Sequence, residues 1–216
     1  MPHSLDLLVV GDAGPDVVVG PLDGPLAFAQ REQLVSGGAL TLGGSAAIMA
    51  CGAARLGLRV AFAGRVGDDD AGRYVRATLG AHGVDTGALR VDPRLPTPLT
   101  VVLTRGDDRA IVTAPGTLPA TTAADVPAEL PAAARHVHAA SYFLPPGLAA
   151  GLPGRAGDSF DAGFVAALLA GLALPEAPEL AAVCGALSTR AHGGTPAQPT
   201  WDEAFAQVTR NGENPA

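Results

Sequence analysis

Residues 154–171 read G-R-A-G-D-S-F-D-A-G-F-V-A-A-L-L-A-G, a glycine-rich loop that runs into an apolar stretch. Phe160, Phe164 and Leu168 recur every four residues, which is the spacing of one buried face of a helix. The first backbone N–H groups of a helix have no partner within it, and the helix dipole adds positive charge. A loop that enters a helix in this way can therefore bind an anion.

Two interpretations of the residues just before this helix are open. Ala156, Gly157 and Asp158 could present backbone N–H groups to a phosphate. Asp158 could equally be an ordinary N-cap whose carboxylate satisfies those donors itself. The spacing alone favours the cap, so a function at this junction needs support from elsewhere in the chain.

The composition limits the classes of function. With 216 residues, 48% of them hydrophobic and 16% charged, the chain can bury a core, and we expect one domain over residues 1–216. A net charge of −7 argues against nucleic acid or an anionic membrane as partners, because both need clustered basic side chains. No apolar run of about eighteen residues and no signal-like N-terminus occurs, so we expect a cytoplasmic protein.

Lysine is absent, since all 14 basic residues are arginine. The chain therefore cannot form a Walker A loop, the strand lysine of a protein kinase or a Schiff base with pyridoxal phosphate. Cys51 and Cys184 lie in no metal or redox motif, and we expect both to be reduced and buried. These features favour small molecules as partners.

Apolar strands that alternate with helical patterns predict an α/β fold, in which ligands bind at the carboxyl ends of parallel strands. The expected strands cover residues 5–11, 59–67 and 135–143. The expected helices cover residues 45–57, 71–82, 178–192 and 201–209. The Ala- and Pro-rich residues 114–131 predict a surface loop or short helix.

Two segments, residues 17–41 and 99–113, break into short β-prone pieces and predict a small separate sheet. In the second segment, residues 106–108 form the turn of an expected hairpin. The preceding G-D-A-G-P-D at residues 11–16 lacks the spacing of a dinucleotide fingerprint, so we interpret it as a turn.

No metal site is predicted. His136 and His138 share one face of an expected strand, but no third ligand is evident, and a half-buried strand edge explains them better. Asp68, Asp69 and Asp70 precede a helix, and we expect them to cap it and face water.

Together, G-D-S-F-D-A-G-F at residues 157–164 and G-G-S-A-A-I at residues 43–48 resemble the two signatures of the ribokinase-like (PfkB-type) carbohydrate kinases. V-G-D-D-D-A-G at residues 66–72 resembles a third family motif. The resemblance implies a mostly parallel sheet with helices on both faces. It also implies that the two β-prone segments form a lid over the sugar and a possible homodimer face.

The resemblance also assigns roles to individual residues. Asp158 would take the proton from the sugar hydroxyl, and Ala156 and Gly157 would form the anion hole for the transferred phosphoryl group. The sugar contacts implied by the resemblance are Asp16, Gly43 and Gly44. ATP and Mg²⁺ are the implied cosubstrate and cation, with the sugar as acceptor.

The chain departs from the family pattern at three places. Arg155 stands where a glycine is usual, and Ile48 stands where an asparagine is usual. The interval from Leu144 to Gly157 holds no strand, whereas the family has several βα units here, so we expect a fold that is incomplete in the middle. The Mg²⁺-ordering N-x-x-E motif of the family is absent, because Asn211 and Asn214 are the only asparagines.

These features predict a carbohydrate kinase that moves the γ-phosphoryl group of ATP to a sugar hydroxyl. The alternative is a non-catalytic sugar-binding or regulatory relic of such a kinase that lacks the nucleotide half. Because the shortened middle would remove strands that shape half of the cleft, we expect little ATP turnover.

Overall fold

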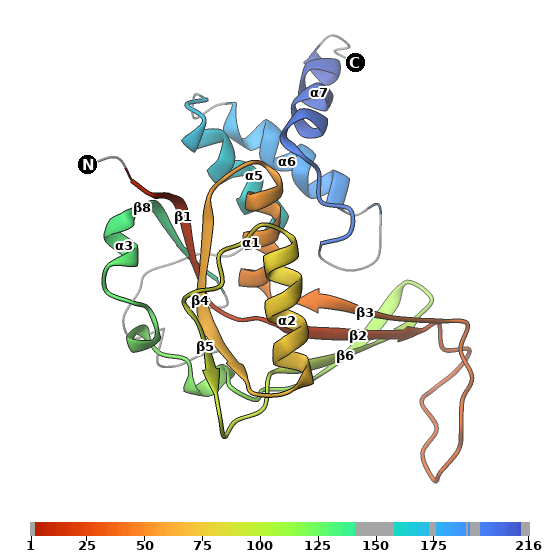
Figure 1. Cartoon of the computed structure of the whole chain (residues 1–216). Coiled ribbons are helices and arrows are strands. Elements are labelled where there is room, and N and C mark those ends of the chain that lie inside the picture. The colour runs from red at the N-terminus through yellow and green to blue at the C-terminus, as the bar shows by residue number, and fades with distance from the viewer. Residues whose placement is uncertain (1–2, 141–157, 173–175, 189, 191–194, 213–216) are drawn as a thin grey trace.

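The computed structural model describes residues 3–140, 158–172, 176–188, 190 and 195–212 (Figure 1). Four parallel strands form a central sheet in the order β5-β4-β1-β8. Their bounds are β1 Leu5–Val10, β4 Val60–Gly67, β5 Leu89–Asp92 and β8 Ala134–Ala139. The predicted α/β fold with a parallel sheet is confirmed. The strand expected over 135–143 ends earlier, at Ala139, and residues 141–143 lie outside the described part of the chain.

Strand β1 lies inside the sheet, with β4 on one side and β8 on the other. Its side chains from Leu7 to Val10 are at most 1% exposed. Leu7 and Val9 enter the main core, whereas Leu8 and Val10 enter a second cluster on the opposite face. This alternation explains the continuous apolar run of the sequence, because both faces of the strand are covered.

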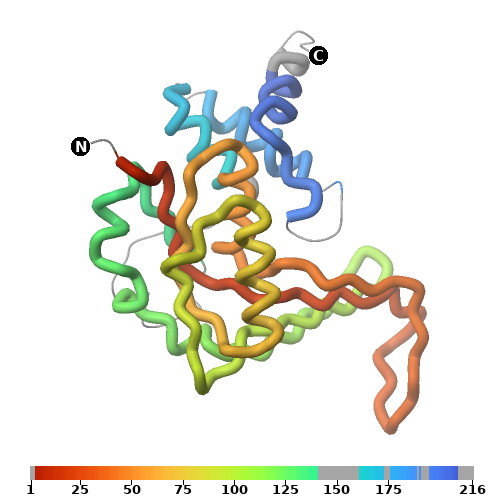
Figure 2. The backbone as a smooth tube through the Cα atoms, viewed as in Figure 1, coloured from red at the N-terminus to blue at the C-terminus, as the bar shows by residue number. Residues whose placement is uncertain are grey.

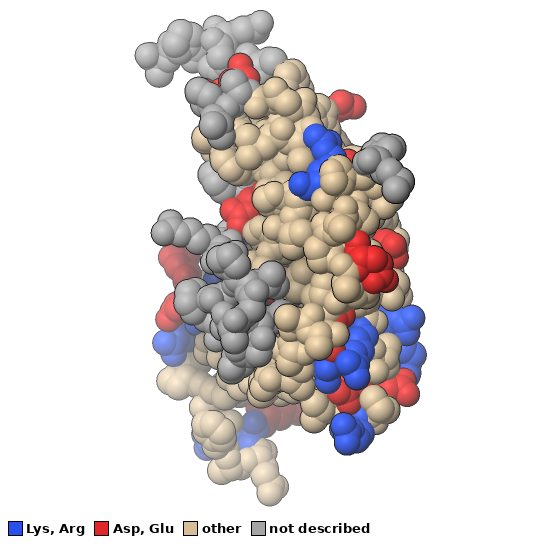
Figure 3. All heavy atoms as spheres, turned by 90° about the vertical axis from the view of Figure 1, so that its left-hand side faces the viewer, with Lys and Arg blue, Asp and Glu red and all other residues tan. Residues whose placement is uncertain are grey.

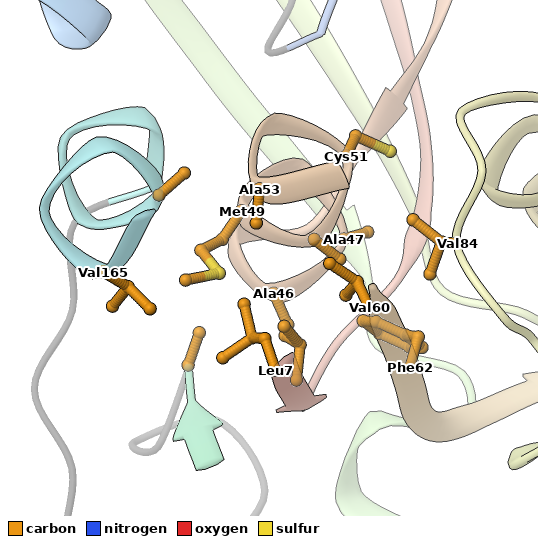
Figure 4. Close-up of a cluster of buried hydrophobic side chains, with 14 of the residues drawn as sticks. Leu7, Ala46, Ala47, Met49, Cys51, Ala53, Val60, Phe62, Val84 and Val165 are labelled. Carbon is orange, nitrogen blue, oxygen red and sulfur yellow. The ribbon is translucent and has the colours of Figure 1, made fainter. Parts of the chain in front are cut away.

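The main core lies between the sheet and a layer of helices. Figure 4 shows Met49 and Ala46 of one helix turned toward Leu7 of β1 and Val165 of another. This layer comprises α1 Ser45–Arg55, α2 Asp70–Ala81, α5 Asp158–Leu169 and α6 Ala177–Ser188, followed along the chain by α7 Trp201–Gly212. The short helix α3 Leu130–Ala133 packs on the other face of the sheet. Among the described helices, none combines the length and hydrophobicity that crossing a membrane requires.

The buried face of α5 differs from the one that the sequence predicts. Leu168 is 36% exposed and Phe164 is only partly buried, while the side chain of Phe160 lies outside the described part of the chain. The residues of α5 that are fully covered are small or branched: Ala162, Val165, Ala166 and Ala167.

The physical reason is the close approach of α5 to α6. A Cβ atom added to Gly163 would lie 2.8 Å from Cys184 Sγ and 2.9 Å from Ala181 Cα, so only glycine fits at this contact. Helices that pack this closely must face each other with small side chains. The four-residue spacing of the large side chains therefore predicted the wrong face of α5, because the residues that are buried there are small. Cys51 and Cys184 are buried and free, as predicted.

A second sheet with the order β3-β2-β6-β7 projects from the body of the molecule (Figures 1 and 2). Strand β2 pairs in parallel with β6 and antiparallel with β3, and β6 and β7 form a hairpin. The bounds are β2 Gly14–Gly20, β3 Gly37–Gly43, β6 Leu99–Arg105 and β7 Asp108–Ala114. The predicted small sheet is confirmed, and we call it the lid. The turn predicted over residues 11–16 is wrong in its second half, because β2 already begins at Gly14.

The segment predicted as a surface loop or short helix, residues 114–131, holds two short 3₁₀ helices, η1 Leu118–Ala120 and η2 Ala123–Asp125, and, unlike a surface segment, a buried carboxylate. Asp125 is 1% exposed at its side chain and pairs with Arg65 of β4 at 2.6 Å and with Arg90 of β5 at 2.9 Å. Arg65 also pairs with Asp92 at 2.9 Å. These ion pairs link the segment that follows the lid to strands β4 and β5 of the central sheet. On the face shown in Figure 3, basic and acidic side chains are interspersed.

Asp125→Ala is expected to lower the free energy of unfolding by about 3–5 kcal/mol, because it leaves the largely buried Arg65 with one partner fewer. The matched control is Asp70→Ala, which removes a salt bridge to Arg73 from a fully exposed carboxylate. Urea unfolding of both variants should show a large change for the first and little for the second. Equal effects of the two substitutions would show that the buried cluster adds no more stability than the exposed salt bridge.

Candidate functional site

The order of the central sheet locates its crevice. The chain runs from β1 to β4 to β5 in one direction and later places β8 on the other side of β1. The direction of winding therefore reverses between β1 and β8, and in open α/β sheets ligands bind at such a point, outside the carboxyl ends of the strands. Gly11 and Asp12 follow β1 here, and the backbone N–H of Ala140 donates to Val10 O at 3.1 Å.

Asp12 holds the beginning of α1. The helix starts after Gly44, which has no side chain to cap it. Instead, Asp12 Oδ1 accepts a hydrogen bond from the backbone N–H of Ala46, and Asp12 O accepts one from Ala47, both at 3.2 Å. Asp12 thus satisfies two of the orphan donors of the helix.

Gly44 makes this contact possible. Its φ of 91° is favourable only for glycine, and an added Cβ atom would lie 2.7 Å from Asp12 O. The Gly43-Gly44 pair could admit either a ligand or another backbone. At Gly44 the neighbour is the backbone of Asp12.

Gly43 has a different neighbour. A Cβ atom added there would collide with the carboxylate of Asp16, which lies on β2. Asp16 is half-buried and pairs across the lid with Thr41 of β3 and Thr100 of β6. Two of the predicted sugar contacts, Asp16 and Gly43, are therefore brought together by the lid.

The Asp16 carboxylate is electrostatically unusual. Burial raises its pKa, and repulsion by Asp12 raises it further, while the positive charge of Arg109 opposes both. Within the described part of the chain, no group donates a hydrogen bond to this carboxylate. The hydroxyl of Thr41 is likewise buried without a hydrogen-bond partner there. Buried polar groups without partners are uncommon unless a ligand or water completes them.

A pocket of about 100 Å³ lies at the base of the lid, where the two sheets meet. It joins the predicted residues Asp16 and Gly44 with polar residues that the sequence reasoning missed. The lining comprises Asp12, Ala13, Gly14, Asp16, Gly44, Pro98, Thr100, Thr113 and Leu118. We call it the lid-base pocket. A larger hollow of about 330 Å³ between Val18 and Thr104 has no ionisable side chain in its lining, so we assign it no chemistry.

The missed residues differ in how they could have been found. Asp12 follows Gly11, the first residue after β1, so its place at the carboxyl end of a strand was a usable signal. Thr100 and Thr113 lie on two strands of the lid, with their hydroxyl oxygens 3.0 Å apart. Their place in the pocket depends on the register of the lid strands, which the sequence pattern does not determine.

Of the glycine-rich loop and the helix that follows it, the structure describes only the residues from Asp158 onward. Helix α5 begins at Asp158, as the sequence predicts, and packs against α1 and α6. Ala156 and Gly157 lie outside the described residues, as does the interval from residue 144, and the side chain of Asp158 is not described. The roles predicted for these three residues remain predictions.

The three acids at the start of α2, Asp68, Asp69 and Asp70, have mainly a structural role. Asp69 is the N-cap and accepts a hydrogen bond from the backbone N–H of Gly72 at 2.8 Å. It does not face water as expected, because it also accepts hydrogen bonds from the backbone N–H and hydroxyl of Thr97, at 2.8 and 2.6 Å. Burial opposes its ionisation, but these hydrogen bonds hold the pKa of Asp69 below its usual value. The described residues include no group of three or more His, Cys, Asp or Glu that could hold a metal ion.

The two histidines of β8 are placed differently from each other. His136 is exposed, whereas His138 is buried, and His138 Nε2 has no hydrogen-bond partner in the described part of the chain. This nitrogen lies 4.0 Å from Asp161 Oδ2 on the first turn of α5. Burial, and then the nearby His136, lower the pKa of His138, so the ring is neutral at pH 7 and the contact is not an ion pair.

This burial predicts a pH dependence of stability. The folded pKa of His138 lies below the unfolded value, so its contribution is complete above about pH 6.5 and is lost as the pH falls through the folded pKa. The loss is at most about 1.4 kcal/mol per pH unit. In His138→Gln, urea unfolding should show a smaller loss of stability between pH 7 and pH 5 than in the unchanged protein. An unchanged slope would mean that His138 titrates alike in both states.

Comparison with known proteins adds sequence and structural relatives. The pattern of the pfkB family carbohydrate kinases matches residues 6–151 and 156–201. Over 92 residues the chain is 35% identical to the 5-dehydro-2-deoxygluconokinase of Lacticaseibacillus casei, which covers 43% of this chain and 26% of that protein. Over 60 residues it is 47% identical to the fructokinase of Klebsiella pneumoniae, covering 28% of this chain and 20% of that one. These matches span about a quarter or less of each relative's length.

Two solved structures share the fold. A protein from Agrobacterium tumefaciens assigned as a ribokinase superposes with a TM-score of 0.80 at 18% identity, covering 98% of this chain and 99% of that one. An E. coli protein assigned as ribokinase II, solved in complex with ATP and Mg²⁺, superposes with a TM-score of 0.76 at 15% identity, covering 95% and 99%. At these identities the likeness shows a common architecture of sheet, helices and lid.

Proposed function

The chain belongs to the PfkB family of carbohydrate kinases, and we propose that it transfers the γ-phosphoryl group of ATP to a hydroxyl group of a sugar. The observation that carries the proposal is the lid-base pocket, where Asp12, Asp16 and Gly44 meet at the reversal point of the sheet. The sugar-kinase names of the relatives support it.

The pocket supplies the chemistry that a sugar needs. Carboxylate oxygens accept hydrogen bonds from sugar hydroxyls, and threonine hydroxyls can donate or accept. Asp16 meets the first requirement because its carboxylate is half-buried and receives no hydrogen bond from the described residues. Thr100 and Thr113 stand beside it in the lining. A bound sugar would donate to the Asp16 carboxylate, while the two threonine hydroxyls already share a hydrogen bond with each other.

In this proposal, the residues at the start of α5 would carry out the phosphoryl transfer. Asp158, at the first position of the helix, would accept the proton of the attacking hydroxyl. The backbone N–H groups of Ala156 and Gly157 would face the oxygens of the transferred group, where helix polarity favours negative charge. ATP, when bound, supplies the phosphoryl group. We assign no ligand to Mg²⁺, because the sequence lacks the N-x-x-E motif and the described residues hold no metal cluster.

A binding-only relic is the second candidate, and the family match does not favour it. Such a relic would need only the sugar pocket, whereas the match continues through residues 156–201 and includes Asp158. We keep the expectation that turnover is low, because residues 144–157 are shorter than the several βα units of the family.

Exposed apolar side chains and the free edge of the lid support a further proposal, a homodimer. Leu40 and Val112 lie on one face of the lid and Ile111 on the other, all three are more than half exposed, and every residue of β7 is exposed. Among the described strands, β7 pairs only with β6, so its other edge can accept a strand or a second lid.

Asp158→Asn is expected to reduce phosphoryl transfer by about 10²- to 10⁴-fold, because an amide cannot accept the hydroxyl proton. Stability should change little, since asparagine caps a helix about as well as aspartate. A coupled ADP-release assay and a thermal melt measure the two effects. Retained activity, or a large loss of stability, would make Asp158 a cap and no more.

Gly43→Ala is expected to weaken sugar binding by about tenfold or more, because the new methyl group displaces the Asp16 carboxylate. Gly38→Ala is the matched control: it lies on the same strand, and its nearest neighbour would be 4.0 Å away. Calorimetric titration of both variants with a neutral sugar gives the comparison. The assignment of Asp16 to the sugar fails if the two variants bind alike.

A further inference from the structure

The charge of the lid-base pocket bears on which sugar it can take. Two carboxylates, Asp12 and Asp16, are the only charged side chains among the described residues that line it. The two charges are close enough to interact, since repulsion by Asp12 is the second cause, after burial, of the raised pKa of Asp16. From this we infer that the acceptor is an uncharged sugar, and that the pocket discriminates against sugar acids and sugar phosphates. The inference rests on the proposed sugar kinase function.

The hydrogen-bonding character of the lining points the same way. Asp12 uses Oδ1 to hold α1, and Asp16 receives no hydrogen bond from the described residues, so the pocket presents carboxylate acceptors. Thr100 and Thr113 add two hydroxyl groups. A neutral polyol offers O–H donors to every one of these groups, whereas a carboxylate or phosphate offers acceptors alone.

Among the described residues, the one cation that acts on Asp16 is poorly placed to reverse this preference. Arg109 lies on β7, four residues from Thr113 toward the tip of the lid, and is not part of the pocket lining. Its effect on Asp16 is the smallest of the three causes and is outweighed by burial and by Asp12. The sequence has no lysine, so no lysine ammonium group can neutralise the pair.

Because the pocket is small, it can discriminate between neutral and anionic groups only at the end of the sugar that it holds. About 100 Å³ is smaller than the few hundred cubic ångströms of a typical closed ligand site, so the pocket holds one end of a sugar. An anionic group on that end would lie next to both carboxylates, where like charges are strongly unfavourable. One relative is named as a 5-dehydro-2-deoxygluconokinase and another as a fructokinase. The inference predicts that the acceptor of this chain is a neutral sugar, as the second name indicates, and not a sugar acid, as the first name indicates.

The test compares D-fructose with 2-keto-D-gluconate, which differ only in that a carboxylate replaces the C1 hydroxymethyl group. Calorimetric titration at low salt should show the acid binding about tenfold or more weakly. Raising the salt to about 1 M, where the Debye length is about 3 Å, should narrow the ratio. The second pair is D-glucose and D-glucuronate, in which a carboxylate replaces the C6 hydroxymethyl group. This pair tests the case in which the pocket holds the opposite end of the sugar.

Asp12→Asn identifies the source of the discrimination. Its amide oxygen can still accept from Ala46, so the start of α1 is preserved while one charge is removed. The ratio between acid and neutral sugar should fall by about threefold or more in this variant. Asp70→Asn removes a fully exposed carboxylate on α2 and should leave the ratio unchanged.

The outcomes separate the inference from the proposed function. Binding of an acid as tightly as its neutral partner overturns the inference and leaves the sugar site in place; loss of that binding in Arg109→Gln would then assign selectivity to Arg109. Binding of no sugar of either kind at millimolar concentration overturns the sugar site itself, and the inference falls with it.

Discussion

The hydrogen bonds from the first turn of α1 to Asp12 are the interaction on which the site depends. They join the carboxyl end of the central strand β1 to the start of the helix that follows the lid. Because β2 starts and β3 ends within a few residues of this junction, the base of the lid is fixed against the sheet at the same point. Gly44 is required there, since any side chain would push the helix away from Asp12.

The same junction sets the electrostatics. Asp12 satisfies helix donors, whereas Asp16, held nearby by the lid, is half-buried and receives no hydrogen bond from the described residues. A half-buried carboxylate without donors from the described residues has lost part of its hydration, so its presence near the reversal point of the sheet suits a group that acts on a ligand. The buried cluster of Arg65 and Asp125 contrasts with it, because there each carboxylate is paired and the role is structural.

Much of this arrangement could be predicted from the sequence, because it depends on local patterns. The apolar run of β1, the Gly43-Gly44 start of α1 and the turn of the lid hairpin all lie where their residues predict them. What could not be predicted depends on contacts between distant segments. The buried face of α5 is set by its distance from α6, and the place of Thr100 and Thr113 in the pocket is set by strand register. Asp125 is buried only because two arginines from neighbouring strands meet it.

The central claim is that the lid-base pocket is the sugar site. Nuclear magnetic resonance of the ¹⁵N-labelled protein during titration with D-fructose tests it most directly, because each backbone amide reports its own surroundings. The account predicts that the amide signals of Gly43, Gly44, Thr100 and Thr113 shift together with one binding constant. Shifts confined to the hollow at the far end of the lid, around Gly37 and Gly38, or no shifts at all, would contradict it.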